Sequence, residues 1–369
     1  MAEKMNGLSR EFIIHPGETL KEILEDRNMS QRELAIRTGV KEAHISKLVN
    51  CLKSISVSFA KKLEYAFGID ASFWINLQAN YDKEMADFEE INMISKEELE
   101  IVQKLKNITD YIQEIGLLSL ETQESMWVIK LRKLLNVSSL TVIPEISQTG
   151  AYRLAVADNV DPYILFTWLR VCDLITSNKK IDQELDIDKL RSKLSLIRKL
   201  TFEEDIKSIH LKLRECFAEC GIKFAIVKHF TGAPVQGVIK KNNDETISLI
   251  MTVRRKFADV FWFTLFHEIG HILNGDIEEK LIDYEFVKNE VEYRADEFAA
   301  NALLDLDEYN SFVEYGDFSL MQISKFCLEQ NIPSYILIGR LQRDGHLEYH
   351  QYSSEKTKYE LDEAEKVMN

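Results

Sequence analysis

The sequence predicts a mainly α-helical protein with one small β-sheet, an α+β fold, and three observations support this class. Glycine and proline are few, at 14 and 5 among 369 residues, so long segments can stay helical. Apolar residues recur at helical spacing over much of the chain, whereas β-branched residues gather around residues 235–251. The two ends of the chain carry different motifs, so we expect separate domains joined by a helical middle region.

Residues 30–49 predict two short helices joined by a glycine turn. Ser30 can cap the first helix, Glu33 follows three residues later, and Gly39 supplies the bend. The pattern is typical of a helix-turn-helix, whose second helix enters the DNA major groove. We expect phosphate contacts from the start of the first helix and base contacts from the second, made by Gln31, Arg32, Lys41, Glu42, His44, Ser46, Lys47 and Asn50.

The middle of the chain predicts helices at residues 97–115, 164–175 and 190–200, from apolar residues at helical spacing. Breaks are expected near residues 82–92 and 136–150.

Residues 235–240 and 245–251 predict a β-hairpin around the turn at residues 241–244. An edge strand formed there could hold a peptide by β-addition, and a plain structural hairpin is an equally good interpretation.

The motif His267-Glu268-Ile269-Gly270-His271 lies in an apolar, helix-like segment and predicts a metal site. Because a helix turns about 100° per residue, His267 and His271 share one face and can bind the same Zn²⁺. Glu268 stands beside them, where it can take a proton from water.

A third ligand is expected from a second helix at residues 289–304, since catalytic zinc commonly takes two histidines and a carboxylate. Glu292 and Asp296 project near the apolar stripe of that helix, where a carboxylate is costly without a partner. A metal for Glu292 and an imidazole N–H for Asp296 explain their placement. Glu290 remains the alternative ligand. Asn274 and Ile277 replace the Gly and His of the longer H-E-x-x-H-x-x-G-x-x-H signature.

Residues 261–273 and the pattern Glu292-x-x-Ala295-Asp296-x-Phe298 together resemble the ImmA/IrrE family of zinc-dependent endopeptidases. The resemblance implies a zincin-like peptidase domain of the gluzincin type. It implies His267, His271 and Glu292 as zinc ligands, Glu268 as catalytic base and Asp296 as the partner of a ligand. His346, His350 and Arg340 are the candidates for stabilising an oxyanion.

The segments around the helix-turn-helix carry a second resemblance, over residues 12–82. His15-Pro16-Gly17-Glu18 before it and Phe73-Trp74-x-Asn76-Leu77-Gln78 after it resemble the HigA-type antitoxin branch of the XRE, lambda-repressor-like DNA-binding domains. Those domains often have an Asn-Gly-Lys turn after the recognition helix, where this chain has Asn50-Cys51-Leu52-Lys53.

Charge and composition limit the partners. The formal net charge is −15, which disfavours non-specific binding to nucleic acid, whereas the first eighty residues are nearly neutral. That balance is typical of a module that binds an operator locally, as a homodimer on a two-part site. We expect a cytoplasmic protein without a membrane span, and its 5 cysteines indicate reduced thiols.

The expected organisation is a DNA-binding domain at residues 1–82, a helical middle region at 83–205, a metallopeptidase domain at 206–352 and a loose charged tail at 353–369. Two functions compete. One is a regulator whose zinc site cleaves a repressor, a toxin–antitoxin partner or its own DNA-binding part. The other is a repressor or antitoxin whose metal domain senses a ligand or docks a partner without turnover.

Overall fold

The computed structural model describes residues 10–119, 121, 123–148, 160–177, 179, 181, 183–277, 281–282 and 290–361. The chain divides into two compact units, Met1–Leu99 and Glu100–Asn369. The described residues are mostly helical, with one small sheet in the second unit, which confirms the expected α+β composition. No helix among them is long and apolar enough to cross a membrane.

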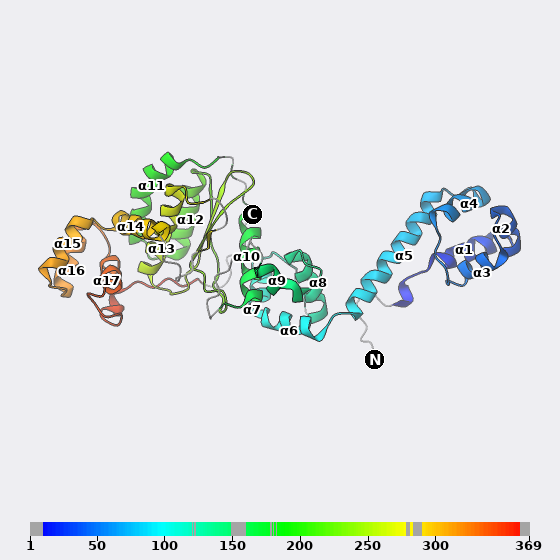
Figure 1. Ribbon diagram of the computed structural model, residues 1–369, viewed down its shortest axis with the longest axis horizontal. Coiled ribbons are helices and arrows are strands. Elements are labelled where there is room, and N and C mark those ends of the chain that lie inside the picture. The colour runs from blue at the N-terminus through cyan, green and yellow to red at the C-terminus, as the bar shows by residue number, and fades with distance from the viewer. Residues whose placement is uncertain are drawn as a thin grey trace. The chain divides into compact units, whose positions relative to one another are not determined.

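The first unit is all-helical (Figure 1). It consists of the 3-10 turn η1 (Arg10–Phe12) and the helices α1 (Pro16–Asp26), α2 (Gln31–Thr38), α3 (Glu42–Val49), α4 (Val57–Phe67) and α5 (Ala71–Asn92). Its core contains fully buried apolar side chains from α1 to α5, among them Leu20, Leu34, Ile45, Leu63 and Trp74. Burial of these side chains is the main stabilising contribution to a unit of this size.

The predicted helix-turn-helix is confirmed in α2 and α3. The Ser30 side chain accepts a hydrogen bond from the backbone N–H of Glu33, and Gly39 ends α2 with φ 62° in the left-handed region. Helix α1 crosses α3 very closely, since a β-carbon at Gly17 would lie 1.9 Å from the carbonyl oxygen of Leu48. Only glycine fits there.

Helix α5 is longer than the sequence predicts. It runs without interruption through residues 82–92, where we expected a break, and the units divide between Leu99 and Glu100 instead of after residue 82. Its apolar face beyond residue 82 is only partly buried. A helical segment that buries little apolar surface shows weak apolar periodicity, so periodicity does not reveal that α5 continues to its C-cap at Met93. The next helix begins at Lys96.

The expected middle helices come next in the chain, and the boundary between the units after Leu99 falls within the first of them. They are α6 (Lys96–Lys104), α7 (Lys106–Glu114), α8 (Glu124–Leu135), η2 (Leu140–Val142), α9 (Ile143–Gln148), α10 (Pro162–Ser177), α11 (Ile187–Lys199), η4 (Leu200–Phe202) and α12 (Ile206–Ala218). The single helix predicted at 97–115 is two helices that meet at Leu105, a buried residue. The helices predicted at 164–175 and 190–200 are confirmed as α10 and α11. The break expected from residue 136 appears at Asn136, which ends α8 with φ 56°.

The sheet has the strand order β1-β3-β2-β4. Its strands are β1 (Ile222–Ile226), β2 (Gly237–Lys241), β3 (Ile247–Met251) and β4 (Leu281–Ile282). The predicted hairpin is confirmed, with Val238 of β2 antiparallel to Ile250 of β3. Strand β2 is not an edge strand, however, because Val238 and Ile239 also pair with β4. The expectation that the hairpin itself offers the edge is wrong: β4 lies outside it.

Helices cover both faces of this sheet (Figure 1). Helices α12 and α13 (Ala258–Asn274) pack on one face, and α10 packs against β1 from the other. Trp168 of α10 donates its indole N–H to the carbonyl of Lys228 at 3.0 Å, and Asp173 pairs with Lys240 of β2 at 2.9 Å. These contacts make α10, which belongs to the middle region of the sequence, one layer of the second unit. The domain boundary expected at residue 205 would separate this helix from the sheet.

The remaining helices follow α13 in the chain. They are α14 (Glu290–Leu303), α15 (Leu306–Tyr315), α16 (Leu320–Gln330), α17 (Ser334–Arg343) and η5 (Ser353–Glu355). The tail expected to be loose from residue 353 is docked as far as residue 361. Tyr359 is buried, accepts a hydrogen bond from the Trp262 indole at 2.8 Å and donates its backbone N–H to the Lys256 carbonyl. Residues 362–369 lie outside the described part of the chain.

Candidate functional site

Helix α13 carries the H-E-x-x-H motif and is buried along most of its length. It packs against α14 more tightly than large side chains permit. A β-carbon at Gly270 would lie 3.2 Å from the α-carbon of Ala295, so small residues face each other where the two helices cross. This close crossing brings the first turn of α14 within reach of the two histidines.

The structure brings together the ligand atoms of His267, His271 and Glu292, all within 4.8 Å of one another. The two Nε2 atoms are 3.0 Å apart, and Glu292 Oε2 lies 3.1 Å from His267 Nε2 and 3.6 Å from His271 Nε2. A tetrahedral Zn²⁺ with bonds of about 2.0–2.1 Å would separate its ligand atoms by about 3.4 Å. The triangle has the size that zinc requires. Glu290 is exposed and is not part of it.

The opposite ring nitrogens face carboxylates. His267 Nδ1 lies 2.9 Å from Asp296 Oδ1, and His271 Nδ1 lies 3.4 Å from Asp276 Oδ2. When each Nδ1 carries the proton that these carboxylates accept, both Nε2 lone pairs point toward each other and toward Glu292. Three electron-rich atoms then converge on one point, an arrangement that a cation stabilises. The residues present therefore fit a zinc ion.

Electrostatics keeps Glu292 and Asp296 of α14 ionised. Burial alone would raise the pKa of the Glu292 carboxyl, but hydrogen bonds with His267 and His271 outweigh it and lower the pKa to about 2. Burial would also raise the pKa of the Asp296 carboxyl, but the contacts with His267 and Arg343 outweigh burial and lower this pKa. Both side chains are carboxylates at neutral pH, as a ligand and a histidine partner must be.

Glu268 is completely buried, beside the strand β2. A β-carbon at Gly237 would lie 2.1 Å from its Oε1, so the carboxylate rests against bare backbone. Glu268 follows His267 directly in α13, and its carboxylate is held in a fixed position against β2.

Three residues of this centre were not predicted from the sequence. Gly237 makes room for Glu268, Arg343 of α17 forms an ion pair with Asp296 at 2.5 Å, and Asp276 faces His271. Of these three residues, only Asp276 could have been predicted from the sequence, because it follows a glycine at the end of the helix. Gly275 ends α13 in the left-handed region and turns the chain back, so that the Asp276 N–H bonds to the His271 carbonyl.

The residues proposed to stabilise an oxyanion, His346, His350 and Arg340, make other contacts. His346 and His350 are exposed, and the ring of His346 stacks near Phe318. Arg340 pairs with Asp344 at 2.7 Å. None of the described contacts of these three residues reaches the triangle. The cysteines Cys216 and Cys220 are buried core thiols, as expected, and burial raises the pKa of Cys216 to about 11.

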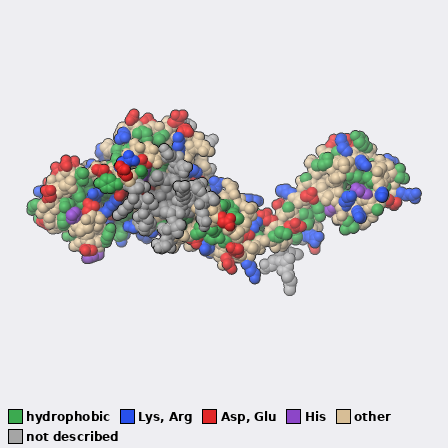
Figure 2. All heavy atoms as spheres, viewed as in Figure 1, with side chains coloured by type: hydrophobic (Ala, Val, Ile, Leu, Met, Phe, Trp, Pro, Cys, Tyr) green, Lys and Arg blue, Asp and Glu red, His purple; other side chains and the backbone are tan. Residues whose placement is uncertain are grey.

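The predicted DNA-contacting residues lie on α2 and α3 of the first unit, with Lys41 and Asn50 as the N-cap and C-cap of α3. Arg32, Lys41, Glu42, Lys47 and Asn50 are exposed, whereas Gln31, His44 and Ser46 are half-buried. Lys and Arg side chains are scattered over the face of this unit that Figure 2 shows.

His44 is more constrained than the other predicted contacts. Its ring lies 5.0 Å from that of Phe59, and Lys53 Nζ approaches its Nδ1 at 3.1 Å. Burial and, to a lesser extent, the charge of Lys53 lower the pKa of His44, which favours the neutral form of the ring.

The matched family model places the first unit in a known class: the helix-turn-helix model matches residues 20–74, and through this unit the chain belongs to the helix-turn-helix family. It is a DNA-binding domain of the XRE type, as residues 12–82 predicted.

Virulence-associated protein I of Dichelobacter nodosus is a relative, 38% identical over 84 residues, which are 22% of this chain and 78% of that protein. Virulence-associated protein A′ of the same organism is 38% identical over 69 residues, 18% of this chain and 60% of that protein.

Solved structures similar to the chain include HigA-type antitoxins. An addiction module antidote protein of the HigA family from Coxiella burnetii is 27% identical and covers 30% of this chain and 97% of its own, with a TM-score of 0.19. The antitoxin HigA of Pseudomonas aeruginosa, solved with the higBA promoter, is 32% identical and covers 22% and 96%, with a TM-score of 0.20.

Proposed function

We propose that the protein is a transcriptional regulator whose second unit is a zinc endopeptidase of the ImmA/IrrE type, with a zincin-like fold, acting on a repressor or a toxin–antitoxin partner. The single observation that carries this proposal is the triangle of His267, His271 and Glu292, with the buried Glu268 directly after His267 on the same helix. A purely structural zinc site would have four protein ligands and no use for an acid in that position.

The residues have separate roles in the proposed reaction. His267, His271 and Glu292 would hold the ion, which when bound supplies Lewis acidity and lowers the pKa of a water molecule. Glu268 would accept a proton from a water molecule at the site and return it to the leaving amine as the peptide bond breaks. Asp296, itself held by Arg343, orients the His267 ring.

Metal content and proteolysis test the enzymatic part. We expect wild type and Glu268→Gln to contain one zinc each and His267→Ala to contain none. Wild type should cleave a protein encoded beside its gene or its own first unit, Glu268→Gln should not, and Glu297→Gln, an exposed neighbour on α14, should behave as wild type. If wild type and Glu268→Gln both hold zinc and neither cleaves any of these proteins, the metal domain is a sensor or docking module without turnover.

The regulatory part of the proposal is operator binding by the first unit. The DNA upstream of the gene is the probe. Lys47→Ala should weaken binding and lower the slope of log affinity against log salt by about 1, because one phosphate or base contact of a cation is lost. Lys83→Ala, on the exposed side of α5, is the control with the same charge change. Equal affinity and slope for wild type and Lys47→Ala would remove this residue from the contacts.

A further inference from the structure

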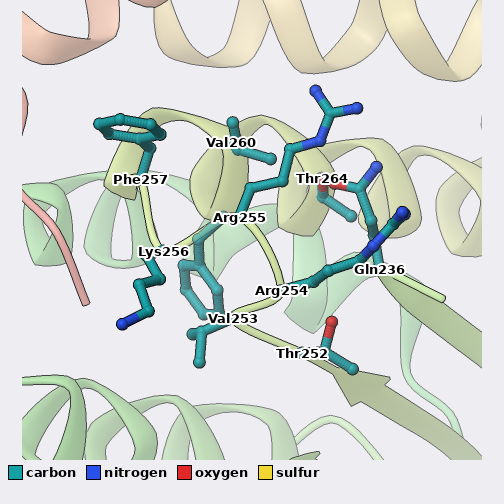
Figure 3. A pocket seen from close by; sticks show the side chains of 10 residues that line it. Gln236, Thr252, Val253, Arg254, Arg255, Lys256, Phe257, Val260 and Thr264 are labelled. Atoms are coloured by element: carbon teal, nitrogen blue, oxygen red, sulfur yellow. Dashed lines mark hydrogen bonds between the residues drawn. The ribbon is translucent and has the colours of Figure 1, made fainter. Parts of the chain in front are cut away.

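The C-terminal strap, residues 349–361, is held against the start of α13. Its backbone bonds to the chain that enters this helix: the Ala258 N–H donates to the Thr357 carbonyl at 2.9 Å, and the Tyr359 N–H donates to the Lys256 carbonyl at 2.6 Å. Figure 3 shows this entry to α13, with Lys256 labelled. The strap therefore satisfies the first N–H of the metal helix, a group that a helix leaves without an internal partner.

One side chain of the strap, Lys356, is buried between α13 and α17. Its ammonium group pairs with the Asp259 carboxylate in the first turn of α13 at 2.5 Å, and the two side chains are only 7% and 6% exposed. The pair rests against bare backbone of α17, since a β-carbon at Gly339 would lie 2.3 Å from Asp259 Oδ2. Loss of one partner of a buried ion pair is costly, because the other charge stays buried alone. The ion pair therefore fixes the strap to two helices at once.

Gln342 of α17 binds the strap at three points. Its Oε1 accepts a hydrogen bond from Lys356 Nζ at 2.9 Å, and its Nε2 donates to the carbonyls of Gln351 and Tyr349 at 2.8 and 3.3 Å. Gln342 is buried, so release of the strap would leave the polar atoms of its amide without these partners, which is costly. The last turn of α17 is therefore held in place by the strap.

The next residue of the same turn, Arg343, contacts the metal centre. Its guanidinium donates to Asp296 Oδ2 at 2.5 Å, and Asp296 Oδ1 lies 2.9 Å from His267 Nδ1. Gln342 and Arg343 are consecutive residues at the end of α17, so a shift of this turn moves both side chains. A continuous series of hydrogen bonds and helix contacts thus joins the strap to one zinc ligand, the kind of network that carries coupling between distant sites.

We propose that the C-terminal strap is a conformational device that positions Arg343, and that docking of the strap and binding of zinc favour each other. With the strap docked, Gln342 and Arg343 are held so that Asp296 keeps the His267 ring in place. Because coupling is reciprocal, zinc holds the strap by the same factor by which the strap strengthens zinc binding. This inference rests on the zinc site of the proposed function and does not require cleavage.

Hydrogen exchange of the full chain, with zinc removed and with saturating zinc, tests the coupling without any substitution. The reporter is the Tyr359 amide, whose bond to the Lys256 carbonyl breaks when the strap is released. The reference is helix α8, which packs against α10 in the same unit. We expect zinc to slow exchange of the reporter about tenfold more than exchange in α8, within the usual range of couplings between sites. Equal slowing in both places would mean that zinc stabilises the unit as a whole, and would overturn the proposal.

Substitution of Arg343 tests whether this residue carries the coupling. In Arg343→Met, the additional slowing at Tyr359 should disappear at saturating zinc, because Asp296 no longer connects α17 to His267. Arg343→Lys keeps a cation at this position and should restore part of the effect. Additional slowing that persists unchanged in Arg343→Met would exclude Arg343 as the positioning residue.

Zinc affinity measures the same coupling in the reverse direction, by competition against a chelator. Lys356→Met should weaken zinc binding about tenfold, although none of the described contacts of Lys356 is with a zinc ligand. Lys358→Met, at an exposed lysine two residues along the strap, has the same change of charge and should bind zinc as wild type does. The double variant Asp259→Asn/Lys356→Met removes both buried charges, so it tests the same loss even where Lys356→Met fails to fold.

The outcomes separate this inference from the proposed function. Zinc affinity equal to wild type in Lys356→Met and in the double variant overturns the strap, whether or not wild type cleaves a protein. Coupling of the expected size without any cleavage by wild type would support the strap and refute only the peptidase. A wild-type protein that binds no zinc would refute both.

Discussion

The Glu268 carboxylate and the Gly237 backbone are in direct contact, so close that a β-carbon on residue 237 would lie 2.1 Å from Glu268 Oε1. The contact joins the strand β2 to the helix that carries both histidines. A glycine is required there by a neighbouring side chain and not by backbone conformation, since residue 237 is ordinary strand.

Gly237→Ala should lower the free energy of unfolding by about 1–3 kcal/mol, the usual cost of overpacking a tight contact. The same substitution in a Glu268→Ala background should cost close to nothing, because the clashing carboxylate is gone. Urea unfolding of the four proteins of this cycle gives the coupling. Equal costs in the two backgrounds would show that the contact does not constrain Glu268. Lys241→Ala, at the exposed end of the same strand, is the control.

Asp296→Asn should weaken zinc binding by about 10–100-fold, since the amide no longer accepts the His267 Nδ1 proton as a carboxylate does. Competition against a chelator of known affinity measures the change. Glu297→Gln has the same change of charge one residue away on an exposed side and should bind zinc as wild type does. An unchanged affinity in Asp296→Asn would exclude Asp296 as the residue that orients His267.

The ion pair of Asp244 with Lys223 should make the hairpin sensitive to acid. Hydrogen bonds from Lys223 and Thr246 lower the pKa of Asp244 to about 2 from its ordinary 3.8. A lowered carboxyl pKa stabilises the fold fully above the unfolded value, and the stabilisation is lost as pH falls through the folded one. The difference in unfolding free energy between wild type and Asp244→Asn should be constant at neutral pH and fall by roughly half near pH 3. A difference independent of pH from 6 to 3 would contradict this.

Cys51→Gly should stabilise the first unit by about 1 kcal/mol. Cys51 has φ 60°, in the left-handed region that glycine adopts without strain. Cys51→Ala, which removes the thiol and keeps the β-carbon, should give no such gain and is the matched control. Thermal unfolding of the full chain, followed through the transition of the first unit, measures both. A destabilised Cys51→Gly would mean that the contacts of the half-buried Cys51 side chain outweigh the strain.

The turn at Cys51 also explains a departure that the sequence showed. The Asn-Gly-Lys turn common after recognition helices is replaced by Asn50-Cys51-Leu52-Lys53, yet the chain keeps the left-handed turn, and the Leu52 N–H bonds to the Lys47 carbonyl at 2.8 Å. The backbone path is preserved while Leu52 is left largely exposed.

The sequence alone determined the local features of this protein. Caps, glycine turns and periodicity are properties of neighbouring residues, so the helix-turn-helix, the hairpin and the helices around His267 and Glu292 followed from short-range rules. The grouping of His267 and His271 with Glu292 was also predicted. The two histidines share one face of a single helix, and the acid lies near the apolar stripe of a second helix.

Only the tertiary structure showed the features that depend on contacts between residues far apart in the sequence. Burial of Tyr359 against Trp262 docks a tail that is charged and uninformative in sequence. Packing of α10 on β1 joins the middle region to the second unit, and β4 takes the edge that the hairpin was expected to offer. Arg343 reaches Asp296 from 47 residues away. Such pairings depend on how whole elements pack, and no spacing within one element encodes them.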